Sequence, residues 1–400
     1  MSPLSSYDDD LAVILLLLAG QTVLQAASLS EMKLKDFMST WEHRLRDRRI
    51  PRCALVDTRV SSFQRLYQSR NDQAFITFTG FDYSSFDYLL SKFSPLYHRY
   101  SPYSLNGKIV RVRDVGPNSG RPRSLGPADC LGLLLGYTRT RGSFFTLQMV
   151  FGATHSVLCL FLKFSMRLLF KVLKEEVDAR VEIPSAEEIA EYKDVVNRSF
   201  PALDGCWCVM DGLKIPIQKS GDDSTQNAYY NGWLHSHFVG CVFVFAPSGV
   251  IVACTLNAPG CWHDSLIAAS AGLYDKLKLV YDTTGGIAVV DSAFSKKRCP
   301  FLIKSGKRKP GETLLQTTIR RQATSLRQSA EWGMRAIQGS FPRLKDKILF
   351  SQTIADRNVF LHLIPMLLNF RTRRLGLSQI MTTFYPVFHA VGDNVLENLE

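Results

Sequence analysis

The chain has 400 residues, of which 46% are hydrophobic and 21% are charged, a composition that excludes an intrinsically disordered protein. Its net charge is +12, and residues 281–350 hold 14 Lys and Arg against 5 Asp and Glu. A basic surface in this segment indicates a partner with a phosphate backbone, although a solvated basic face without any partner is the competing interpretation.

The first predicted element is an apolar run at residues 11–19, which is too short to span a bilayer. Three aspartates precede it, whereas a signal peptide has a positively charged flank, so a buried helix is expected there. The nine cysteines include no Cys-x-x-Cys pair, which argues against a zinc site and a disulfide framework. These features favour a reduced compartment inside the cell and no membrane association.

The N-terminal part of the chain is predicted to be helical. Residues 1–125 form a helical region that ends in a linker rich in Gly, Pro, Ser and Arg, and residues 126–185 form a second helical region. Within the latter, a short helix at 146–151, a glycine-containing turn and a long helix at 155–174 have helix-turn-helix spacing. An ordinary small helical bundle is the alternative, because the long helix carries few polar side chains that could contact bases.

From residue 206 the pattern changes to strands. A strand at 206–210 ends at Asp211, and runs at 238–245 and 250–256 are expected to form a hairpin. A helix at 265–273 follows Asp264. A further strand at 287–290 ends at Asp291, and a long helix over 312–338 carries Glu331. Helices are expected again from residue 346.

This order of elements is that of a ribonuclease H-like α/β domain, in which the first and fourth strands are neighbours and a helix packs across them. Asp211, Asp291 and Glu331 would then converge although they are 80 and 40 residues apart. Convergent carboxylates are typical of divalent metal sites that catalyse phosphoryl transfer, and oxygen ligands suit Mg²⁺.

Each acidic residue also has a purely structural interpretation. Asp264 stands where a side chain often caps a helix, which is as plausible as metal contact. Asp291 could be an ordinary aspartate of a turn after a strand. Glu331 could form a simple surface pair, because Arg327 and Arg335 lie four residues before and after it on the predicted helix.

Four short motifs together resemble Harbinger-type transposases and the nucleases derived from them, over about residues 200–375. They are Asp211-Gly212, Pro259-Gly260 with His263-Asp264-Ser265, Asp291-Ser292-Ala293-Phe294, and Arg327 with Glu331. The resemblance implies a DDE ribonuclease H-like nuclease domain at 200–375, followed by a C-terminal tail at 376–400. The chain departs from the family pattern at Leu213-Lys214, where Thr-His is common, and at Ala293-Phe294, where Gly-Tyr is common.

The resemblance implies catalysis by Asp211, Asp291 and Glu331, and binding of Mg²⁺ or Mn²⁺ by these residues and Asp264. Whether Asp264 or Asp291 is the middle member of the strict triad stays open, and topology favours Asp291. Such proteins cut DNA at transposon ends and join the strands to target DNA in the nucleus, often with a Myb/SANT-like partner protein, and an oligomer is compatible with this activity. The basic residues expected to contact DNA are Lys296, Lys297, Arg298, Lys307, Arg308, Lys309, Arg327 and Arg335.

Two other functions fit the same sequence. One is a domesticated, non-catalytic DNA-binding or adaptor protein derived from a transposase. The other is a metal-dependent nuclease that hydrolyses DNA without joining strands. Because all four acidic residues are present, we favour an active endonuclease or transposase.

Overall fold

The computed structural model describes residues 50–103, 110–112, 122–294, 299–307, 310–348 and 354–385, together with residue 30. The chain divides into two compact units, residues 1–55 and 56–400. The first unit contains the short helix η1 (Arg52–Ala54), and the predicted apolar helix at 11–19 lies outside the described residues. In the described part of the chain, no helix is both long and apolar enough to cross a membrane.

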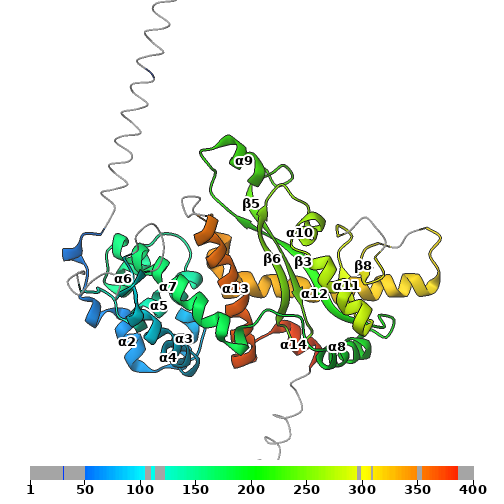
Figure 1. Ribbon diagram of the computed structural model, residues 1–400, viewed down its shortest axis with the longest axis horizontal. Coiled ribbons are helices and arrows are strands. Elements are labelled where there is room, and N and C mark those ends of the chain that lie inside the picture. Colours follow the sequence, from blue (N-terminus) through cyan, green and yellow to red (C-terminus); the bar gives the residue numbers. More distant parts are fainter. Residues whose placement is uncertain are drawn as a thin grey trace, which may run out of the picture. The chain divides into compact units, whose positions relative to one another are not determined.

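The second unit begins with a helical region, drawn in blue to green in Figure 1. Polar side chains begin its first helices: Ser61, Asn71 and Asp82 each accept a backbone N–H from the first turn of the helix that follows. The elements of this region are η2 (Thr58–Val60), α2 (Ser62–Ser69), α3 (Asp72–Thr79), α4 (Tyr83–Arg99), β1 (Tyr100–Ser101), β2 (Val110–Arg111), α5 (Pro127–Arg139), α6 (Phe145–Phe151), α7 (His155–Glu175), η4 (Val177–Ala179) and α8 (Ala186–Ser199).

The short helix, turn and long helix predicted at 146–174 are present as α6, the turn at Gly152 and α7. Gly152 has a φ of +60°, and a Cβ there would lie 2.5 Å from the backbone oxygen of Val56, so only glycine fits this turn. Ten residues of α7 are buried, and its Arg167 forms an ion pair with Asp356. The helix is therefore well packed in the core, and DNA contact by this element stays a prediction.

A mixed sheet forms the centre of the second half. The path of paired strands is β4-β5-β3-β7-β8, and β6, which is off this path, also pairs with β5. Strand β5 runs antiparallel to β3 and β6, whereas β7 runs parallel to β3 and β8. This topology confirms the predicted α/β, ribonuclease H-like class. The strands are β3 (Cys206–Pro216), β4 (Tyr230–Asn231), β5 (Ser236–Phe245), β6 (Ile251–Pro259), β7 (Ile287–Val290) and β8 (Leu302–Lys304).

Helices cover both faces of this sheet. Val209, Leu213 and Phe245 belong to one apolar cluster with residues of α12, whereas Met210 and Val244 belong to another with residues of α8, α10 and α11. The alternation follows from the period of two in a strand. Figure 1 shows α12 running across the sheet. The helices of this half are α9 (Asp223–Tyr229), α10 (Asp264–Ser270), α11 (Leu273–Thr284), α12 (Leu314–Ser340), η5 (Pro342–Lys345), α13 (Ile354–Leu375) and α14 (Gln379–Phe384).

The structure corrects one predicted boundary near the acidic residues. The first strand does not end at Asp211 but continues to Pro216, because Leu213 and Ile215 are buried and the strand stays paired with β5 along this length. Asp211 therefore lies inside a strand. The hairpin β5–β6 and the strand β7 agree with the sequence prediction.

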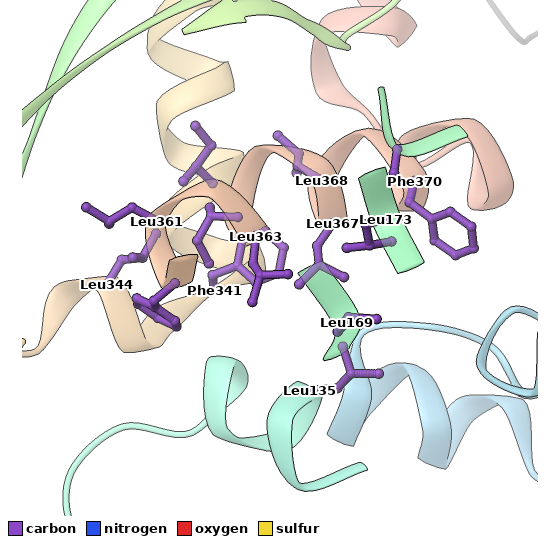
Figure 2. Packing of buried hydrophobic residues seen from close by; sticks show 14 of the residues in the cluster. Leu135, Leu169, Leu173, Phe341, Leu344, Leu361, Leu363, Leu367, Leu368 and Phe370 are labelled. Atoms are coloured by element: carbon purple, nitrogen blue, oxygen red, sulfur yellow. The ribbon is translucent and has the colours of Figure 1, made fainter. Parts of the chain in front are cut away.

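One apolar core continues from the helical region into the sheet half of the same unit. Leu135 of α5, Leu169 and Leu173 of α7, and Leu363 and Leu367 of α13 meet in it, as Figure 2 shows. Burial of each such leucine contributes about 1.5–3 kcal/mol. The domain boundaries predicted at 125/126 and 375/376 stay predictions, while the packing makes α13 a component of both regions.

Candidate active site

Asp211 lies inside β3, and Asp291 directly follows β7, the strand that pairs with β3 in parallel. The parallel pairing of β3 with β7 ends with Met210 opposite Val290, and each aspartate is the next residue in the chain. Strand β7 stops there, so Asp291 begins a loop, while β3 continues with Asp211 opposite Phe243 of β5. The two aspartates that the sequence analysis placed together are therefore neighbours in the fold.

Asp211 faces helix α12. Its neighbours two positions away on β3, Val209 and Leu213, belong to the cluster on the α12 side, and successive side chains alternate between the faces of a strand. Nη1 of Arg327 lies 3.5 Å from Oδ2 of Asp211, and Nη2 of Arg327 donates a hydrogen bond of 2.7 Å to Oε1 of Glu331. One guanidinium thus bridges the first and last carboxylates of the predicted triad.

Asp264 lies on the other side of β3. A Cβ built on Gly212 would meet the Asp264 carboxyl carbon at 2.5 Å, so this carboxylate packs directly against the glycine backbone. Gly212 directly follows Asp211 in the strand and therefore presents the opposite face of the sheet. The absence of a side chain at position 212 is what allows Asp264 to approach this closely.

The interpretation of Asp264 as a helix cap is not supported. The residue at the cap position of α10 is His263, and no side chain accepts a hydrogen bond there. Asp264 is instead the first residue of the helix, with the nearby Lys214 ammonium as a counter-charge. Lys214 stands at the position where the sequence departs from the family pattern.

The three aspartates affect one another electrostatically. Burial raises the pKa of Asp211, and the charges of Asp291 and Asp264 raise it further, against the lowering effects of the Gly212 N–H and of Arg327. Burial also raises the pKa of Asp264, with Lys214 opposing it and Asp291 reinforcing it. Asp291 therefore interacts with a carboxylate on each side of β3. Burial is the largest cause of the raised pKa values of Asp211 and Asp264, so a positive charge beside them would stabilise their ionised forms.

The donor atoms of this cluster suit a hard divalent cation, because all are carboxylate oxygens. The Arg327 bridge further shows that a positive group fits between Asp211 and Glu331. Among the residues that the structure describes, however, no three His, Cys, Asp or Glu side chains are gathered closely enough to hold a metal ion. The placement of Asp211 and Asp264 on opposite faces of β3 is one physical reason for this.

Residues 210–369 match the family described as DDE superfamily endonuclease. This part of the chain is a DDE superfamily endonuclease domain, of the Harbinger-type, transposase-derived family. The searches of curated proteins and of solved structures found no match. The matched range begins at Met210, next to Asp211, and ends at Asn369 within α13, so it includes all four acidic residues.

Three of the basic residues predicted to contact DNA are described in the endonuclease domain. Lys307 and Arg335 are exposed, whereas Arg327 is bound to Asp211 and Glu331. The others lie outside the described residues: Lys296, Lys297, Arg298, Arg308 and Lys309. The DNA contacts thus stay predictions, and the structure gives Arg327 a second set of partners.

Two contacts in the candidate site could not be predicted from the sequence. The pair between Arg327 and Glu331 was visible as a spacing of four residues, but the contact of Arg327 with Asp211 depends on how α12 crosses β3. The contact of Gly212 with Asp264 joins residues 52 positions apart in the sequence. Its only sequence signal is the glycine itself, in the middle of a strand where glycine often marks a close approach.

Proposed function

We propose that this protein is a metal-dependent DNA endonuclease of the transposase type, which cleaves DNA at transposon ends and joins strands. Asp211, Asp291 and Glu331 are the proposed catalytic, metal-binding carboxylates, with Asp264 as a fourth ligand. The observation that carries the proposal is the placement of Asp211 and Asp291 on paired strands under a helix that brings Glu331 to Asp211 through Arg327. The endonuclease family match over the same residues supports it.

The residues of the site would do distinct work in this reaction. Bound Mg²⁺ or Mn²⁺ would supply the positive charge that activates a water molecule or a DNA 3′-hydroxyl and stabilises the leaving oxygen. The backbone N–H of Gly212 donates a hydrogen bond of 2.8 Å to Oδ1 of Asp211, and this bond fixes the orientation of the Asp211 carboxylate relative to the strand. Burial and the neighbouring carboxylates raise the pKa of Asp211 and Asp264, so a bound cation would stabilise their ionised forms.

DNA is the substrate class that the family implies, and its details are also proposals. The exposed Lys307 and Arg335 would contact phosphates, because basic side chains supply most of the sequence-independent affinity for DNA. We further propose that the protein acts in the nucleus and that a Myb/SANT-like partner contributes to recognition of the transposon ends.

The test is cleavage of double-stranded DNA by the purified full chain with Mg²⁺ or Mn²⁺. Asp211→Asn, Asp291→Asn and Glu331→Gln should each reduce cleavage at least about a hundredfold, since each removes a charged ligand while preserving shape. Asp282→Asn is the matched control, because Asp282 pairs with Lys278 on the surface of α11 and should tolerate the change. DNA binding without any metal-dependent cleavage would favour the non-catalytic adaptor instead.

A further inference from the structure

The Arg327 guanidinium occupies a place that the proposed reaction needs for another cation. It contacts Oδ2 of Asp211 at 3.5 Å and Oε1 of Glu331 at 2.7 Å, so it touches one carboxylate oxygen from β3 and one from α12. A divalent ion shared by Asp211 and Glu331 would use the oxygens of the same two carboxylates. Because two cations that share the same ligands repel each other, the guanidinium and the metal compete.

We infer that Arg327 is a displaceable counter-ion, which balances Asp211 and Glu331 without metal and moves to a DNA phosphate when a divalent ion takes its place. The inference rests on the proposed function and adds a regulatory step to the same site. By moving from the two carboxylates to a DNA phosphate, Arg327 would couple metal binding to DNA binding.

The geometry of Arg327 supports such an exchange. The side chains of Arg327 and Glu331 are 23% and 42% exposed, so water screens the attraction between their charges and the ion pair is weak. The contact with Asp211 at 3.5 Å is longer than a good charge-assisted hydrogen bond. A guanidinium on a long side chain can leave these oxygens without any movement of α12, and its planar fork suits a phosphate.

The experiment measures Mn²⁺ affinity of the purified full chain, by the loss of the electron paramagnetic resonance signal of free Mn²⁺. Arg327→Gln should bind Mn²⁺ about three- to tenfold more tightly than the wild type, because the competing charge is gone. Arg327→Lys keeps a charge and should stay close to the wild type. Arg321→Gln is the matched control, since it removes an exposed arginine from the same helix and should change Mn²⁺ affinity little.

A second measurement distinguishes counter-ion exchange from a purely structural role. With Mn²⁺ present, Arg327→Gln should bind a short DNA duplex several-fold more weakly than the wild type. Without metal, the two proteins should bind it equally, since Arg327 is then held by the carboxylates. Wild-type or lower Mn²⁺ affinity in a folded Arg327→Gln protein overturns the inference alone if Asp211→Asn abolishes Mn²⁺ binding. If the wild type itself binds no Mn²⁺, the proposed function fails as well.

Discussion

At the scale of single residues, the packing on the two faces of β3 explains why the pair Asp211-Gly212 lies in the middle of this strand. Asp211 faces α12, and the next position must leave room for the Asp264 carboxylate on the other face of the sheet. Only glycine allows this packing, because a Cβ at position 212 would lie 2.5 Å from the carboxyl carbon of Asp264. The glycine therefore determines where Asp264 lies, and with it the charge around Asp291.

This contact predicts a specific coupling between positions 212 and 264. Gly212→Ala should destabilise the protein by about 1–3 kcal/mol, because the added methyl group overlaps the carboxylate of Asp264. In an Asp264→Ala background the same substitution should cost much less, since the overlapping group is absent. Urea denaturation of the two single variants and the double variant measures this. An equal cost of Gly212→Ala in both backgrounds would show that the two residues do not touch.

At the scale of elements, two glycines allow helices to pack closely on β5 from opposite faces. A Cβ on Gly333 of α12 would lie 2.6 Å from the ring of Phe245, and a Cβ on Gly240 would lie 2.3 Å from the side chain of Ile267 in α10. Each close approach brings an element of the site toward the sheet. Gly333 stands two residues after Glu331, so the seating of α12 on β5 also sets the position of that carboxylate.

Two glycines in the same helix should therefore respond in opposite ways to alanine. Gly333→Ala should lower the free energy of unfolding by about 1–3 kcal/mol, because α12 must move away from Phe245. Gly339→Ala, where a Cβ would meet nothing within 4 Å, should raise it by about 0.5–1 kcal/mol through better helix propensity. Thermal or chemical denaturation checks both. Stabilisation by Gly333→Ala would contradict the close packing of α12 on the sheet.

The order of the elements could be predicted from the sequence because the spacing of apolar residues and the turn residues that bound each run are local signals. Runs such as 238–245 and 287–290 are apolar and bounded by turns, and both are strands in the structure. Helix α11 was missed, since it follows α10 after a two-residue break in which Gly272 has a φ of +65°. The short strand β8 was missed too, because its three residues carry almost no periodicity.

The acidic residues of the candidate site were predicted by type and order, and their spatial relations were not. Which face of β3 each carboxylate approaches depends on register and on the seating of two helices, and no short window of sequence encodes that. The extension of β3 to Pro216 illustrates the difficulty, since Asp211 and Gly212 interrupt an apolar run that the fold nevertheless continues. The alternation of Leu213 and Ile215 was the available signal.

At the scale of the whole unit, Asp346, which directly follows η5, links the helical region to the segment after α12. Its Oδ2 accepts a hydrogen bond of 2.8 Å from the N–H of Gly142, and its Oδ1 accepts one of 3.0 Å from Nε of Arg141. Burial raises the pKa of Asp346, but these hydrogen bonds and the charges of Arg343 and Arg141 outweigh it, so the pKa lies below its ordinary value. The folded protein therefore favours the ionised form of Asp346.

The stabilisation by Asp346 should be visible as a pH dependence. A lowered pKa in the folded state means that the contribution is present above the ordinary value of 3.8 and is lost as the pH falls through the folded pKa. Asp346→Asn should cost about 1 kcal/mol at pH 7, since the ion pairs are partly exposed. The cost should shrink below about pH 4. Urea denaturation between pH 7 and the acid limit of folding tests this, and a cost that grows with acidity would contradict it.

The continuous core around α13 has a consequence for inheritance. The recognisable endonuclease segment ends at Asn369, in the middle of a helix whose Leu363 and Leu367 pack among leucines of α5 and α7. If a gene rearrangement moved only this segment into another protein, the apolar surface of α13 that packs against α5 and α7 would be exposed to solvent. Such an exposed surface promotes aggregation. The helices that precede the endonuclease segment must therefore be transferred together with it. The smallest part of the gene that can be transferred to give a folded protein is larger than the segment at 210–369 that matches the family.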